Sequence, residues 1–119
     1  ETAVEANRVQ AQWLLASGDT AGAIAAFERV TWIDLNDQDA WRRRAELATA
    51  IGRHADAVVA RRVIVAMRPS DILAARADLA EALLRSGDHA AARGELLSVL
   101  ELAPSFERAQ ELLLEARRP

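Results

Sequence analysis

The chain has 119 residues, of which 51% are hydrophobic and 28% charged, with a formal net charge of −3 at neutral pH. This length suffices for one domain with its own core, while the negative charge argues against a nucleic-acid partner, because phosphate backbones attract basic proteins. Cysteine is absent, which excludes disulfides and thiolate chemistry, and no apolar run approaches the roughly 20 residues of a membrane span, so we expect no membrane insertion in this segment.

Alanine and arginine shape the composition: all fifteen basic residues are arginine, and lysine is absent. Both residue types favour helices, so the composition predicts an all-α fold. The preference for arginine is typical of a GC-rich genome and suggests a bacterial source. The charges are unevenly distributed, because residues 38–69 carry a net +4 while residues 1–37 sum to −4 and residues 70–119 to −3.

Three glycines recur at a nearly constant spacing. Gly18 and Gly52 are 34 residues apart, Gly52 and Gly87 are 35 apart, and each is followed five residues later by an alanine. A period of this size is typical of a helical repeat array. Because glycine accepts the left-handed conformation in which helices often end, we expect each glycine in the bend of a helical hairpin.

The first unit reads as two helices. Val4 to Ser17 form the first, with apolar residues at helical spacing, namely Val9, Trp13 and Leu14. Asp19 is placed to cap the second helix, which runs to about Ile33. Asn36 and Asp37 then end the unit and cap the next helix.

The later units repeat this plan. The second contains Trp41 in its first helix and ends at Pro69, because proline cannot continue a helix. The third opens after Ser70, is capped at its second helix by Asp88 and stops at Pro104. Ser105 is expected to cap a last helix from Phe106 to about Arg117. The pattern predicts seven helices whose short links make neighbours antiparallel.

With each glycine at the fifteenth place of a unit, the chain resembles the tetratricopeptide repeat family. The small residues at the eighth and twentieth places match, and they are Ala11, Ala45 and Ala80 and then Ala23, Ala57 and Ala92. Pro69 and Pro104 match the late proline, from which Leu35 departs. A large residue at the fourth place is met by Trp41, whereas Asn7 and Arg76 depart from it.

This resemblance implies a single domain over residues 1–119, an α-solenoid in the form of a right-handed superhelix. Its three helix-turn-helix units would span about 4–37, 38–71 and 73–106, with a C-terminal capping helix at about 105–117. Each unit would leave an apolar face that its neighbour covers.

The resemblance also implies a concave groove, lined by the first helix of each unit, that binds a peptide. By their places in the repeat, the candidate groove residues are Arg8, Gln12, Arg42, Arg43, Glu46, Thr49, Asp78, Glu81 and Arg85. Because the arginine fork binds carboxylates in pairs of hydrogen bonds, an acidic segment or a free C-terminus is the expected ligand. The alternative is that these charged residues form a solvated face that binds no ligand. Some relatives clamp a terminal carboxylate with basic residues where Ala74 and Asp78 stand, so that clamp is not expected.

Two arginines and the three tryptophans need separate interpretation. Arg44 and Arg61 fall at places that usually face the core, and we expect them to reach solvent or pair with local carboxylates. The alternative is a loosened middle unit that binds a partner. Trp41 is expected in the packing, as is Trp13, whereas Trp32 lies late in a helix and is expected to be exposed at a contact surface.

The sequence favours a protein-interaction scaffold and no enzymatic activity. The serines fall mostly at helix ends, and no glycine-rich phosphate loop is present. No cofactor or metal is expected, because His54 and His89 stand one repeat apart and no further ligands accompany them. Two alternatives stay open: a self-assembly module forming a homo-oligomer, and a substrate-presenting module of a larger enzyme. The start at Glu1 suggests an excised domain or processed product, and the composition fits the cytoplasm and the periplasm equally.

Overall fold

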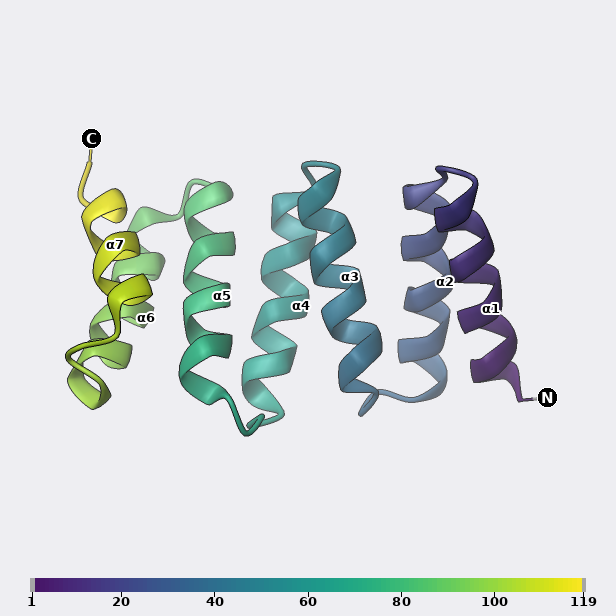
Figure 1. Cartoon of the computed structure of the whole chain (residues 1–119), viewed down its shortest axis with the longest axis horizontal. Coiled ribbons are helices and arrows are strands. Elements are labelled where there is room, and N and C mark those ends of the chain that lie inside the picture. Colours follow the sequence, from purple (N-terminus) through teal and green to yellow (C-terminus); the bar gives the residue numbers. More distant parts are fainter. Residues whose placement is uncertain (1, 119) are drawn as a thin grey trace.

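The computed structural model describes residues 2–118, which form seven α-helices and no strand. In chain order they are α1 (Ala3–Ala16), α2 (Thr20–Ile33), α3 (Gln38–Ala50), α4 (His54–Ala66), α5 (Ile72–Arg85), α6 (His89–Leu102) and α7 (Glu107–Ala116). Figure 1 shows them side by side along the longest axis, with the two termini at opposite ends. The predicted all-α architecture is confirmed.

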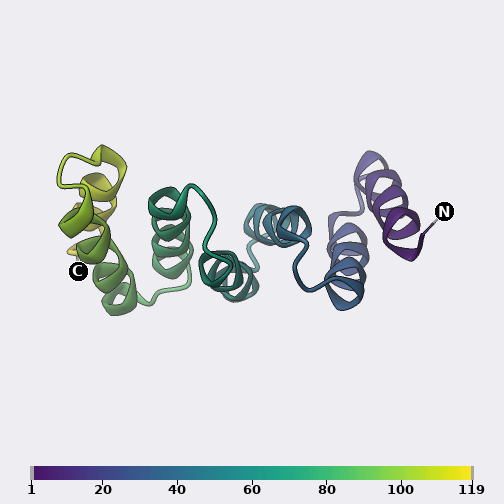
Figure 2. The same cartoon turned by 90° about the horizontal axis from the view of Figure 1, so that it is seen from below.

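The helices stand in two rows that together form an elongated solenoid. Seen along the other axis in Figure 2, the chain zigzags between a row of first helices, α1, α3 and α5, and a row of second helices, α2, α4 and α6. Helix α7 packs against α6 and α5 and closes the C-terminal end. The radius of gyration is 15.4 Å, compared with about 13.5 Å for a compact domain of this length. No helix within residues 2–118 is both long and apolar enough to cross a membrane.

The same glycine turn closes each helix pair. Gly18, Gly52 and Gly87 have φ values of 85°, 78° and 91°, in the left-handed region where glycine is unstrained. After each glycine, the next amide donates back across the helix end, and the three bonds have similar lengths, Asp19 to Leu14 at 2.7 Å, Arg53 to Ala48 at 2.8 Å and Asp88 to Leu83 at 2.9 Å. The three glycines therefore lie at the bends of successive hairpins, as predicted.

Aspartates cap three of the helices. The carboxylates of Asp19, Asp37 and Asp88 each accept a hydrogen bond from the amide three residues later, at 2.8 to 3.1 Å. The prediction for Ser105 is wrong, because Phe106 occupies the N-cap position of α7 and no side chain caps that helix. Phe106 packs against the core around α5, α6 and α7, and this packing fixes where the helix begins.

The core is divided along the solenoid instead of forming one central mass. One cluster joins α1, α2 and α3 around Phe27, a second joins α3, α4 and α5 around Trp41 and Ile64, and a third joins α5, α6 and α7 around Leu96. The alanines at the eighth place of each unit are completely buried, and they are Ala11, Ala45 and Ala80. Their small side chains let the two helices of a pair approach closely.

Two apolar residues of α1 do not belong to this core. The predicted packing of Trp13 is wrong, because its side chain is 78% exposed, and Val9 is also 51% exposed. Each stands two residues from the buried Ala11, which at 3.6 residues per turn places it on the far side of the helix. Leu14 does pack against the core, together with Val4.

Candidate functional site: a cleft between the first helices

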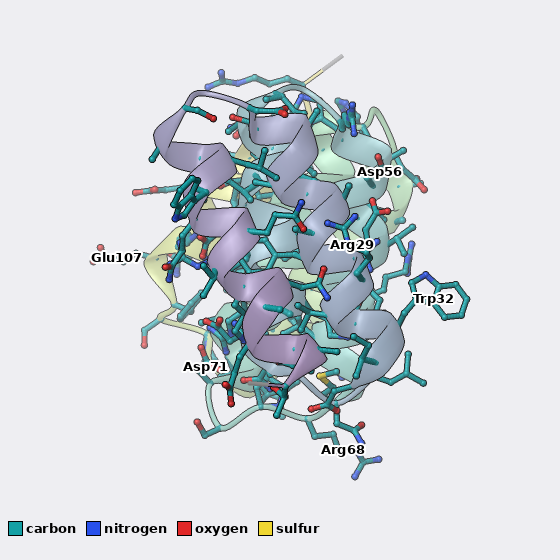
Figure 3. All side chains as sticks on the ribbon, turned by 90° about the vertical axis from the view of Figure 1, so that its right-hand side faces the viewer. Arg29, Trp32, Asp56, Arg68, Asp71 and Glu107 are labelled. Carbon is teal, nitrogen blue, oxygen red and sulfur yellow. The ribbon has the colours of Figure 1, made fainter. Side chains whose placement is uncertain are left out.

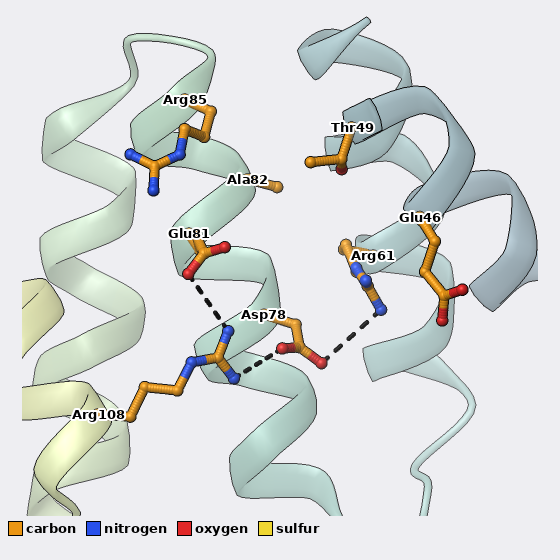
Figure 4. Close-up of a pocket in the computed structure, with 8 residues that line it drawn as sticks. All are labelled: Glu46, Thr49, Arg61, Asp78, Glu81, Ala82, Arg85 and Arg108. Atoms are coloured by element: carbon orange, nitrogen blue, oxygen red, sulfur yellow. Dashed lines mark hydrogen bonds and ion pairs between the residues drawn. The ribbon is translucent and has the colours of Figure 1, made fainter. Parts of the chain in front are cut away.

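A cleft of about 250 Å³ opens on the row of first helices. Its lining side chains come from α3, α4, α5 and α7, and they are Glu46, Thr49, Arg61, Asp78, Glu81, Ala82, Arg85 and Arg108 (Figure 4). We call this hollow the α3–α5–α7 cleft. The structure thus brings together Glu46, Thr49, Asp78, Glu81 and Arg85, which are five of the residues predicted to line the groove.

Two arginines complete the cleft, and sequence reasoning did not place them there. Arg108 of α7 lies at 2.7 Å from Asp78 and 3.5 Å from Glu81, while Arg61 of α4 approaches the other oxygen of Asp78 at 3.7 Å (Figure 4). Asp78 therefore holds a guanidinium on each side. Burial lowers the pKa of Arg108, but its hydrogen bond to Asp78 and the charges of Asp78 and Glu81 outweigh burial, so its pKa is raised.

The remaining polar groups of the cleft are more open to water. Arg85 pairs with Glu115 of α7 at 3.0 Å, and both side chains are close to half exposed. Thr49 donates to the carbonyl of Ala45 at 2.8 Å, and Glu46 is exposed. The cleft thus combines a fixed network around Asp78 with polar groups that a ligand can reach.

Arg8 ties the first repeat to the second. Its guanidinium donates to Asp37 and, at 2.8 Å, to Asp39, both at the start of α3. The hydrogen bond to Asp37 is the main reason that the pKa of Arg8 is raised, since burial acts in the opposite direction and more weakly. Arg8 does not line the α3–α5–α7 cleft, and its contacts indicate a structural role.

Arg42 makes a similar but more exposed contact. Its guanidinium lies at 3.2 Å from Asp71 before α5, and at 3.3 Å from Gln38. Arg43 and Gln12 are exposed, and neither lines the cleft. Two of the three arginines that we expected to face the groove therefore already contact carboxylates within the chain.

Arg61 and Arg44, the two arginines at places that usually face the core, have different partners. Arg61 pairs with Asp78, as predicted. Arg44 instead stacks on the ring of Trp41 at 4.4 Å and donates to the hydroxyl of Thr31 at 3.1 Å, and no carboxylate of residues 2–118 lies within 4 Å of it. Of the two outcomes expected for Arg44, pairing with a carboxylate is therefore not found among residues 2–118.

Within the described part of the chain, no group of three or more His, Asp or Glu side chains is arranged to hold a metal ion. His54 and His89 are the first residues of α4 and α6.

No family model matches the sequence, and no curated protein does. Solved structures are nevertheless similar over nearly the whole chain. The TPR domain of P58(IPK) superposes with a TM-score of 0.82 at 19% identity, covering 96% of this chain and 32% of that one. The second TPR domain of human RPAP3, in complex with an HSP70 peptide, gives 0.75 at 17% identity, covering 98% and 97%. This chain has a tetratricopeptide repeat fold.

A third similar structure is a Thermobaculum terrenum O-GlcNAc transferase mutant, with a TM-score of 0.63 at 26% identity. The alignment covers 96% of this chain but 22% of the transferase, so the chain spans a small part of that enzyme. In the tetratricopeptide repeat fold of this chain, the α3–α5–α7 cleft lies on the row of first helices, where the resemblance placed the groove.

Proposed function

We propose that this chain is a protein-interaction scaffold that binds a peptide segment of a partner in the α3–α5–α7 cleft. The cleft itself carries the proposal, because it is a hollow of about 250 Å³ lined by charged and polar side chains on a preassembled solenoid. A preformed surface saves the entropy of ordering the site on binding. The similar structure of human RPAP3 holds an HSP70 peptide, which supports the same kind of ligand here.

We further propose that the peptide carries an acidic residue. Arg85 lines the cleft, and its ion pair with Glu115 lies at the surface. Exposed pairs contribute about 0–1 kcal/mol each, so a carboxylate of the ligand can replace the internal partner at little cost. Arg8 is excluded from this role, because Asp37, which it contacts, is largely buried and caps α3.

The experiment is a steric block of the cleft. Peptides are first selected from a random phage-displayed library on the wild-type chain, and their affinity is then measured by fluorescence polarisation. Thr49→Phe places a large side chain among the cleft residues and is expected to weaken binding at least tenfold. Val59→Phe, at a position of α4 that is 54% exposed and does not line the cleft, is the matched control and should leave the affinity unchanged.

Circular dichroism of both variants verifies that the helices are intact. If folded Thr49→Phe binds the selected peptides as well as the wild type does, the cleft is not the binding site. If no peptide is selected at all, the scaffold function itself is contradicted.

A module of a larger enzyme is the second candidate, and the likeness to part of an O-GlcNAc transferase favours it. The chain would then present substrates to a catalytic domain in the same polypeptide. An antibody raised against this chain tests the idea on an immunoblot of the source cells. A band far above 13.0 kDa is expected, and a band near that mass would contradict the proposal.

A further inference from the structure

A second hollow lies at the junction of α2 and α3, away from the α3–α5–α7 cleft. It has a volume of about 220 Å³ and is lined by Thr31, Trp32, Leu35, Trp41 and Arg44. We call it the Trp32 pocket. Figure 3 shows Trp32 projecting outward from α2 on the side opposite Glu107 of α7. The two hollows share no lining residue.

Three apolar side chains line the Trp32 pocket, and two of them are largely exposed. The indole of Trp32 is 84% exposed and Leu35 is 64% exposed, while Trp41 is buried beneath them. The N–H of the Trp41 indole already donates to the carbonyl of Leu35 at 2.9 Å. Trp41 therefore offers the pocket an apolar ring surface, and a hollow of this size accommodates one aliphatic or aromatic side chain.

The guanidinium of Arg44 lines this pocket without a carboxylate partner among residues 2–118. The guanidinium of Arg44 stacks on Trp41 at 4.4 Å and gives one hydrogen bond, to Thr31 at 3.1 Å, although it has five N–H donors. Burial lowers the pKa of Arg44, and the charges of Glu28 and Asp56 offset this in part from beyond 4 Å. A carboxylate placed against the free donors would form a charge-assisted pair in partly desolvated surroundings.

We propose that the Trp32 pocket is a second binding site, which takes an acidic peptide segment of a partner protein. An apolar side chain of the segment would lie between Trp32, Leu35 and Trp41, and a neighbouring Asp or Glu would pair with Arg44. The guanidinium of Arg44, stacked on Trp41 with one hydrogen bond to Thr31, favours a segment that carries a carboxylate over a purely apolar one.

The experiment uses the three tryptophan indole N–H signals in the ¹H–¹⁵N spectrum of the full chain. The probe is the blocked peptide acetyl-Glu-Glu-Leu-Glu-Glu-amide. Two matched peptides carry Gln at all four acidic positions, or Ser in place of Leu. We expect the probe to shift the Trp32 and Trp41 signals with saturation at about millimolar concentration, and to leave Trp13 unmoved. Each matched peptide should bind at least tenfold more weakly.

Variants assign the effect to the pocket. Arg44→Met keeps the apolar stem and should abolish the preference for the Glu peptide, whereas Arg62→Met, at an exposed arginine of α4 that lines neither hollow, should change the affinity less than twofold. Trp32→Ala should abolish the shift of the Trp41 indole signal on addition of the probe. This second variant still tests the pocket if Arg44→Met does not fold. Thr49→Phe, which blocks the α3–α5–α7 cleft, should leave the shifts unchanged.

Several results would overturn the proposal: equal binding of the Gln peptide, equal shifts at Trp13, or loss of the shifts in Thr49→Phe. Shifts of Trp32 that grow with protein concentration in the absence of peptide would assign the surface to a second copy of the chain instead. Because Thr49→Phe and Trp32→Ala affect different hollows, failure here is distinguishable from failure of the cleft proposal.

Discussion

At the scale of single residues, the sign of the backbone angle φ decides whether replacing a glycine by alanine stabilises or destabilises the fold. Gly52 lies in a hairpin bend with φ of 78°, and Gly94 lies inside α6 without positive φ. A Cβ added at either position would meet no atom within 4 Å. The two sites therefore differ in backbone conformation and not in available space. The same change from glycine to alanine at each site isolates the effect of backbone conformation.

Gly94→Ala should stabilise the chain by about 0.5–1 kcal/mol, because alanine loses less backbone entropy in a helix. Gly52→Ala should destabilise it by about 1 kcal/mol, because alanine is strained at positive φ. Urea denaturation followed by circular dichroism measures both changes. A loss of stability in Gly94→Ala, or none in Gly52→Ala, would show that the turn and helix assignments are wrong.

At the scale of the helix, burial depends on which face a residue occupies. Leu96 and Leu97 are neighbours in α6 with the same side chain, yet Leu96 is completely buried and Leu97 is 47% exposed. Leu96 stands in the core that joins α5, α6 and α7, where a cavity cannot be filled without moving neighbouring helices.

Leu96→Ala is therefore expected to lower the free energy of unfolding by about 2–5 kcal/mol. Leu97→Ala, the matched control, should lower it by about 1 kcal/mol or less. Equilibrium unfolding in urea gives both values. Comparable losses in the two variants would contradict the orientation of α6.

The sequence allowed much of the fold to be predicted, because short-range rules govern it. The glycine turns and the caps by Asp19, Asp37 and Asp88 depend on residues within one or two turns of the helix. Trp13 shows the limit, since apolar character and helical spacing did not reveal that Ala11 and Leu14 already define the buried face.

The candidate site was harder to predict, because its contacts span whole repeats. Arg108 and Asp78 are 30 residues apart, and nothing in the local pattern of α7 indicates that Arg108 turns toward α5. The contacts of Arg8 were equally hidden from the local pattern, because its place in the repeat suggests an arginine that faces the groove without a partner. Only the structure shows that Asp37 and Asp39 hold it.

At the scale of the whole molecule, ion pairs about one repeat apart connect successive first helices. The paired residues are 31 apart for Arg8 and Asp39, 29 for Arg42 and Asp71, 30 for Arg85 and Glu115 and 30 for Arg108 and Asp78. Because each core cluster serves only adjacent helices, these pairs add a second link between repeats.

The pair of Arg8 and Asp37 can be isolated with a matched substitution. Asp37→Asn retains a good N-cap but removes the charge facing Arg8, whereas Asp88→Asn changes a cap that has no arginine partner among residues 2–118. We expect Asp37→Asn to cost about 1 kcal/mol more than Asp88→Asn, with a smaller difference at 1 M salt. Equal losses at low salt would argue that the pair does not join the repeats.

The most direct test of the central claim, that the first-helix row binds a peptide in the α3–α5–α7 cleft, is amide chemical-shift mapping of the ¹⁵N-labelled chain with a selected peptide. The account predicts that the perturbed amides lie in α3, α5 and α7 around Thr49, Glu81 and Arg108. Perturbations confined to α2, α4 and α6, with those three helices unchanged, would contradict it.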